Sequence, residues 1–184
     1  MSNLQPRPIE LCTLGRFDIY INGTPLRFAR RAPQRTLQLL TVLIAQGSRS
    51  VSIGTIADLL WPDAEAYDAE RAFTTTLHRL RRLLGAADSV HLVAGQVWLE
   101  PEVCGVDAWR LEAELRSAEG PDELLAALER YRGPFLGDDP NSWAIAARAR
   151  LERLVSGARR LLVNSANETA PWRLALGRTW ASAD

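Results

Sequence analysis

Residues 71–85, RAFTTTLHRLRRLLG, combine arginines, threonines and one of the chain's two histidines with the spacing of an amphipathic helix. On a helical wheel that turns by about 100° per residue, one apolar stripe is formed by Phe73, Leu77, Leu80 and Leu84. A continuous polar stripe is formed by Arg71, Thr75, His78 and Arg82. Thr74 and Arg79 border this polar stripe, and Arg81 lies nearer the apolar one. We therefore expect a helix with one buried face and one face that offers hydrogen-bonding groups to a partner.

The three consecutive threonines, Thr74, Thr75 and Thr76, are not explained by helix stability, because threonine is about 0.5 kcal/mol less favourable than alanine in a helix. A threonine methyl can pack on a thymine methyl, and arginine can bind guanine through two hydrogen bonds or grip a phosphate. The polar stripe therefore suits the major groove of DNA. A second interpretation stays open, since most arginine-rich helix faces are simply solvated.

Periodicity and turn residues predict the elements around this helix. Asn22-Gly23 indicates a hairpin turn, because both residues tolerate a positive φ. Ser52 is a cap for the second helix, and Gly85 ends the arginine-rich one. In chain order we expect strands at 9–14 and 17–21, helices at 33–46, 53–61 and 68–84, and a β-hairpin at 90–93 and 96–99.

From Asp107 onward the pattern is helical throughout. The last two segments fit an αα-hairpin of the tetratricopeptide kind, although so few helices do not prove a repeat. We therefore expect two domains, an α+β domain over residues 1–104 and an all-α domain over residues 105–184. The amphipathic segments of the second domain are 107–119, 121–132 and 141–162.

The first half of the chain resembles the winged helix-turn-helix domain of OmpR/PhoB-type regulators. RAFTTTLHRLRRLLG resembles the recognition helix of that family, LGRFDIYINGTPL its N-terminal sheet, and IADLLWPDA its second helix with the following loop. This resemblance covers residues 9–100. The second half resembles the bacterial transcriptional activator domain of SARP-like and MalT-like regulators, in VWLEPEVCGVDAWRLEAEL, ALERYRGPFLGDD and WAIAARARLERL.

The resemblance implies a sequence-specific DNA-binding transcriptional regulator whose third helix enters the major groove, and we expect it to be an activator. The groove-facing residues would be Arg71, Thr74, Thr75, His78 and Arg82. Arg79 and Arg81 would contact phosphates, and Arg31 and Arg35 would do so near the start of the first helix, where a solvated basic turn is the other interpretation. The wing tip, Ala94-Gly95-Gln96, lacks the arginine that such wings often carry, and the nearby His91 is either a helper or structural.

The partners implied are double-stranded promoter DNA and, through the acidic loop 62–68, RNA polymerase. The helical domain would serve for interaction and dimerisation. In the family this domain normally continues for several more helices, whereas here the last residues carry a heavy apolar load, at Trp172, Leu174, Leu176 and Trp180. Because a shortened helical array leaves an apolar face exposed, we expect a homodimer through the helical domain.

Composition excludes several other classes of protein. All 22 basic residues are arginine, so a Walker A site and lysine-based catalysis are excluded within this sequence. Two cysteines and two histidines show no zinc or nucleophile–base spacing, and we expect no enzyme, no metal and no cofactor.

We find no transmembrane run and no secretory signal, and the sparse cysteines favour a reduced, cytoplasmic setting. The 22 acidic residues balance the arginines, so net charge does not indicate nucleic acid. The rival interpretation is therefore a protein-interaction adaptor built on a winged helix.

Overall fold

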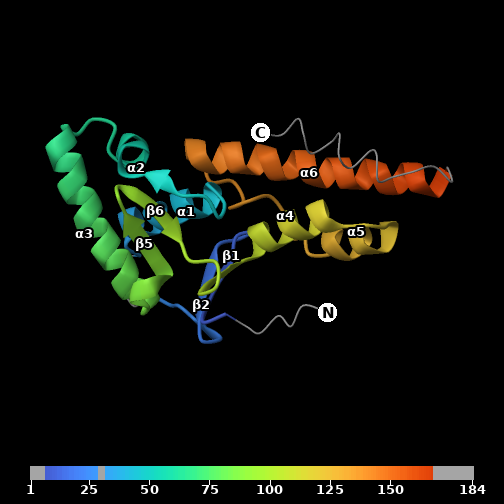
Figure 1. Cartoon of the computed structure of the whole chain (residues 1–184), viewed down its shortest axis with the longest axis horizontal. Helices are drawn as coiled ribbons and strands as arrows, with labels where there is room; N and C mark the ends of the chain where they lie inside the picture. The colour runs from blue at the N-terminus through green and yellow to red at the C-terminus, as the bar shows by residue number, and fades with distance from the viewer. Residues whose placement is uncertain (1–6, 29–31, 168–184) are drawn as a thin grey trace. The chain divides into compact units, whose positions relative to one another are not determined.

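A computed structural model describes residues 7–28 and 32–167, which form two compact units (Figure 1). The first unit holds residues 7–11 and 18–106, and the second holds residues 12–17 and 107–167. The chain therefore passes from one unit to the other three times. The sequence analysis places the domain boundary after residue 104, and the last change of unit falls between residues 106 and 107. It did not predict that residues 12–17 belong to the second unit.

The first unit contains a four-stranded sheet with the order β3-β2-β1-β7, formed by β1 (Ile9–Cys12), β2 (Asp18–Ile21), β3 (Thr24–Pro25) and β7 (Cys104–Val106). β2 and β3 pair antiparallel across Asn22 and Gly23, whose φ angles of 48° and 76° fit the hairpin turn expected there. β1 and β7 pair in parallel, with Ile9 opposite Cys104. The sheet is therefore mixed, not antiparallel as expected, because a strand from the end of the unit joins the first strand.

Three helices follow β3 in the chain: α1 (Gln34–Ala45), α2 (Ile53–Leu60) and α3 (Ala66–Leu84). The hydroxyl oxygen of Ser52 caps α2 by accepting a 3.0 Å hydrogen bond from the backbone N–H of Thr55. Gly85 ends α3 with a φ of 70°. α3 packs against both α1 and α2. It begins two residues earlier than expected, and this places Tyr67 in its first turn.

A second sheet, of order β4-β6-β5, completes the first unit. β5 (Val90–Val93) and β6 (Gln96–Leu99) form the expected antiparallel hairpin, which turns at Ala94 and Gly95 with φ angles of 49° and 78°. β4 (Val51–Ser52) pairs antiparallel with β6. Periodicity did not predict β4, because two residues cannot show an alternation. The first unit thus has a sheet, three helices and a hairpin in chain order.

The described part of the second unit contains α4 (Asp107–Ser117), α5 (Pro121–Leu128) and α6 (Ser142–Asn167). These three helices pack against one another. Glu112 of α4 is buried, and its Oε1 lies 2.8 Å from Arg116 Nη2 and 3.6 Å from Arg150 Nε, so its charge is compensated. The sequence of α6 also predicts an apolar stripe of Trp143, Ala147, Leu151, Leu154, Ala158 and Leu161. The first five of these residues are buried, and Leu161 is half-buried.

Residues 12–17 belong to the second unit because Asp107, the first residue of α4, binds them. Its carboxylate accepts hydrogen bonds from the backbone N–H of Thr13 at 2.7 Å, from the Thr13 hydroxyl at 2.6 Å and from the Leu14 N–H at 3.0 Å. Thr13 is fully buried, so these donors have no water to replace the carboxylate. The strand expected over 9–14 therefore ends early, and its last residues serve the helical unit.

The motif RGPFL is explained by the same segment. Leu14 forms an antiparallel bridge with Phe135, and the Gly15 N–H donates to the carbonyl of Pro134 at 2.9 Å. A Cβ atom on Gly15 would lie 2.8 Å from the carbonyl oxygen of Arg132, so only glycine allows this approach. Arg148 of α6 also holds this loop, because its Nε donates a 3.1 Å hydrogen bond to the Phe135 carbonyl. These residues of the motif are structural.

Candidate nucleic-acid interface

α3 divides into a buried face and an exposed face, in the pattern that its sequence predicts. The apolar stripe of Phe73, Leu77, Leu80 and Leu84 is buried, together with Ala69 and Thr76. The polar stripe is exposed along its length, and so are both residues that border it, Thr74 and Arg79. Because the buried face is fixed in the core of the first unit, the exposed side chains extend from a rigid support.

The three threonines direct their hydroxyls back onto the helix. Thr74 Oγ1 donates to the Glu70 carbonyl at 2.9 Å, Thr75 Oγ1 to the Arg71 carbonyl at 3.0 Å, and Thr76 Oγ1 to the Ala72 carbonyl at 2.7 Å. Each hydroxyl proton is therefore used inside the helix. Exposed Thr74 and Thr75 retain a methyl group and oxygen lone pairs for an outside partner, whereas Thr76 is buried.

Cations from two helices meet in one groove beside α3. Arg35, in the first turn of α1, lines this groove together with Arg71 and Arg79 of α3, although they are far apart in the sequence. The groove is completed by Trp61, Asp68, Ala72, Thr75 and Thr76. Three guanidinium groups against one carboxylate make the groove a cationic surface of the kind that binds phosphate.

The sequence analysis missed Tyr67, which belongs to the same surface. Tyr67 is 71% exposed, and the Arg71 guanidinium carbon lies 5.8 Å from the centroid of its ring. A shallow hollow next to this pair is lined by Tyr67, Glu70, Arg71, Thr74 and Thr75. The signal was present in the sequence, because Tyr67 stands four residues before Arg71, but the helix was expected to begin after it.

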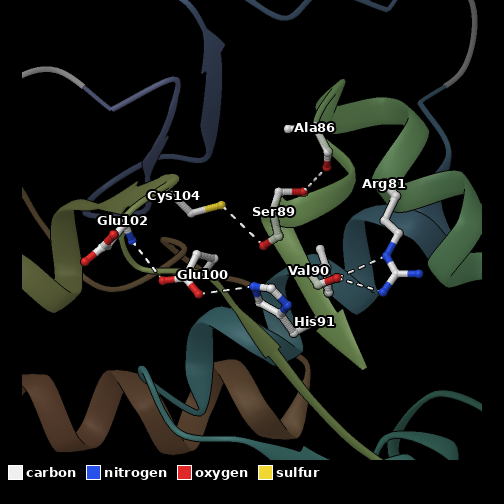
Figure 2. Close-up of polar contacts among 8 residues, drawn as sticks. All are labelled: Arg81, Ala86, Ser89, Val90, His91, Glu100, Glu102 and Cys104. Atoms are coloured by element: carbon white, nitrogen blue, oxygen red, sulfur yellow. Dashed lines mark hydrogen bonds and ion pairs between the residues drawn. The ribbon is translucent and has the colours of Figure 1, made fainter. Parts of the chain in front are cut away.

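Arg81 has a structural role that differs from the phosphate contact expected of it. Its Nε and Nη2 donate hydrogen bonds of 3.0 Å and 2.8 Å to the carbonyl oxygen of Val90 (Figure 2). The side chain is half-buried, and it ties the last turns of α3 to the first residue of β5. The helical wheel places Arg81 near the apolar stripe of α3. At that position its guanidinium reaches the β5–β6 hairpin and binds the Val90 carbonyl.

The β5–β6 hairpin carries a histidine that is also held by neighbours. The ring of His91 stacks on Trp98 with centroids 5.1 Å apart. Its Nε2 lies 3.1 Å from Glu100 Oε2, as Figure 2 shows. These contacts favour the structural interpretation of His91. Near the tip, Leu92 is 38% exposed and Val93 is 59% exposed, followed by exposed Ala94, Gly95 and Gln96. The hairpin therefore offers apolar and amide groups but no cation.

Some expected contacts fall outside the described residues, namely Arg31 and the four apolar residues Trp172, Leu174, Leu176 and Trp180. Among residues 7–28 and 32–167, neither Arg79 nor Arg82 forms a direct ion pair. Asp63 and Glu65 of the loop after α2 are exposed. No group of metal-ligating side chains, and no helix long and apolar enough to cross a bilayer, occurs among residues 7–28 and 32–167.

Comparison with known proteins found a similar fold among solved structures but no matching family model or curated protein. Among solved structures, a similar fold occurs in Mycobacterium tuberculosis EmbR, solved in complex with a low-affinity phosphopeptide. The TM-score is 0.64 at 22% sequence identity, over 85% of this chain and 45% of the EmbR chain. The chain thus spans under half the length of EmbR, with which it shares a mixed α/β fold.

Proposed function

We propose that the chain is a sequence-specific DNA-binding transcriptional regulator, whose first unit is a winged helix-turn-helix domain of the OmpR/PhoB type. The observation that carries this proposal is the exposed polar stripe of α3, with the opposite face of the helix anchored in the core. A helix held in this way can read bases in a major groove. The similarity in fold to EmbR supports a regulator of the SARP-like type.

In this proposal the contacts fall into two sets. Arg71 and Arg82 bind base edges, where Thr74, Thr75 and His78 add methyl and polar contacts. Arg35 and Arg79 bind the phosphate backbone from the cationic groove. Arg81 is left out of both sets because its guanidinium binds the Val90 carbonyl. Each phosphate contact releases counterions, so affinity should fall steeply with salt.

The remaining roles extend the same proposal. The second unit is a tetratricopeptide-like domain in this proposal. It mediates homodimerisation, and two subunits then read two half-sites. The exposed acidic loop after α2, which carries Asp63 and Glu65, contacts RNA polymerase, so that the regulator acts as a cytoplasmic activator. The buried stripe of α6 is used within the unit, so the dimer needs other residues of the helical domain.

A protein-interaction adaptor is the second candidate, and one observation favours it. The tip of the β5–β6 hairpin exposes Leu92 and Val93 and carries no arginine. An apolar tip suits a protein surface better than a phosphate backbone. The adaptor would leave the polar stripe of α3 without a DNA partner, and this difference is testable.

The test is selection of bound sequences from a random duplex library by the full chain, followed by titration of the selected duplex over a salt series. DNA reading predicts an enriched motif and a steep loss of affinity with salt. Arg71→Ala and Arg82→Ala should each lose about 1–3 kcal/mol of specific binding. Arg153→Ala, which removes an exposed arginine of α6, is the matched control and should bind like wild type.

Two results would contradict the proposal. Wild-type protein that enriches no motif favours the adaptor, and the search should then move to protein partners. An enriched motif that Arg71→Ala and Arg82→Ala bind as tightly as wild type would show that DNA is read by another surface.

A further inference from the structure

The first turns of α3 surround one shallow hollow with an aromatic ring, a carboxylate, a guanidinium and two threonines: Tyr67, Glu70, Arg71, Thr74 and Thr75. We propose that this hollow, the α3 hollow, reads a G·C base pair. Arg71 binds the guanine, Glu70 accepts from the cytosine, and Tyr67 positions Arg71. The inference rests on the proposed function, and it names the base pair and two residues that the sequence analysis did not single out.

Tyr67 is placed to orient Arg71 and gains little from burial itself. Tyr67 is 71% exposed, and the Arg71 guanidinium lies over its ring, 5.8 Å from the centroid. A guanidinium that stacks on a ring keeps its fork of N–H donors free at the edge. Arg71 therefore has fewer conformations to lose when it binds the O6 and N7 acceptors of guanine.

Glu70 gives the α3 hollow its selectivity. A carboxylate is repelled by phosphates, so its presence beside Arg71 disfavours a simple backbone grip. In the major groove a G·C pair offers two acceptors on guanine and then the N4 amino donor of cytosine. Guanidinium donors next to a carboxylate acceptor complement this order. An A·T pair offers acceptor, donor and acceptor instead, and would leave groups of Arg71 or Glu70 unpaired.

The neighbouring cationic groove has the composition that a phosphate-binding surface requires. It collects Arg35, Arg71 and Arg79 from two helices around a single carboxylate. The α3 hollow holds one guanidinium and one carboxylate, with a ring beneath the guanidinium. Arg71 lines both surfaces, so it stands where the phosphate-binding surface gives way to the base-reading one.

The test compares the motifs that full-length variants select from a random duplex library. Wild type should require G·C at one position of each half-site. Tyr67→Leu should lower the preference for that pair about two- to fivefold, the value of an exposed cation–π contact, and leave the other positions unchanged. Tyr67→Phe keeps the aromatic ring and should therefore show the same preference for G·C as wild type. Glu70→Gln, whose amide can donate as well as accept, should relax the same position.

The chain offers a matched control in its second unit. Arg159 lies over the ring of Tyr131 at the same 5.8 Å, so Tyr131→Leu removes an equivalent pair away from α3 and should leave the motif unchanged. Circular dichroism of each variant should report a folded protein, because Tyr67 and Glu70 are exposed. An enriched wild-type motif that neither Tyr67→Leu nor Glu70→Gln alters would overturn this inference and leave DNA binding intact. Wild type without any motif would overturn both.

Discussion

The guanidinium of Arg81 binds the carbonyl oxygen of Val90 through two hydrogen bonds, at 3.0 Å from Nε and 2.8 Å from Nη2. One arginine of α3 is thus committed to holding the β5–β6 hairpin. Arg81→Ala should therefore lower the free energy of unfolding by about 1–2 kcal/mol, because a charge-assisted contact is lost and the carbonyl of buried Val90 loses its donor. Urea denaturation followed by circular dichroism measures this change.

The same variant separates the structural role of Arg81 from a DNA contact. If Arg81 bound phosphate, its loss would reduce the slope of log affinity against log salt by about 1. We expect that slope to stay at the wild-type value for Arg81→Ala and to fall for Arg79→Ala. A reduced slope with unchanged stability would restore Arg81 to the set of phosphate contacts.

Thr75 tests the use of a methyl group in base reading. Its hydroxyl donates to the Arg71 carbonyl at 3.0 Å, so Thr75→Ser keeps that bond and removes only the methyl. The binding free energy of wild type for the selected duplex should weaken by about 0.5–1 kcal/mol when one thymine is replaced by uracil, which lacks the methyl. Thr75→Ser should not distinguish the two duplexes.

Thr76→Ser is the control for that measurement. Thr76 makes the equivalent hydrogen bond to Ala72 but is buried, so its methyl packs in the core. Its removal should cost stability and leave thymine discrimination as in wild type. Discrimination that survives in Thr75→Ser would assign the thymine contact to another residue.

Gly15 and Gly23 separate two reasons for a glycine. Both have a positive φ, 80° and 76°, so alanine at either position costs about 1 kcal/mol of backbone strain. Only at Gly15 would a Cβ also meet backbone, 2.8 Å from the Arg132 carbonyl oxygen, whereas nothing lies within 4 Å at Gly23. Gly15→Ala should therefore destabilise the protein clearly more than Gly23→Ala in thermal denaturation. An equal loss of stability in the two variants would mean that residues 12–17 shift to accommodate the added Cβ at little energetic cost.

Cys104 predicts a pH dependence of stability. Burial, with a smaller contribution from Glu100 and Asp88, raises the pKa of its thiol from 9.0 to about 12. Because the pKa of the thiol is higher in the folded state than in the unfolded state, the buried neutral thiol contributes to the free energy of unfolding. This contribution is fully present below pH 9 and is lost as the pH rises toward 12. The thiol itself donates to the Ser89 carbonyl at 3.7 Å (Figure 2).

Alkylation at pH 8 checks this environment directly. Half-buried Cys12 should react with iodoacetamide in the folded protein, whereas Cys104 should react only after unfolding. Cys104→Ser should flatten the loss of stability above pH 9. Rapid modification of Cys104 in folded protein would contradict the burial of its thiol.

Local features of the sequence were sufficient for most elements of the fold. The apolar spacing of α3, the Ser52 cap, the Gly85 stop and the two hairpin turns each depend on residues within one or two turns of each other. Such short-range signals act in the chain before any tertiary contact exists, and for that reason they can be read from the sequence. The polar stripe of α3 was found in the same way.

Tertiary structure decided how individual side chains are used. Arg81 resembles its neighbouring arginines in the sequence, and only the approach of β5 shows that it binds Val90. Arg35 joins Arg71 and Arg79 in one groove because α1 packs against α3. Thr13 belongs to the helical unit through Asp107, 94 residues away. Sequence periodicity reports which face of an element is buried, but the partner that each polar group finds depends on contacts between distant segments, and these are set only when the chain has folded.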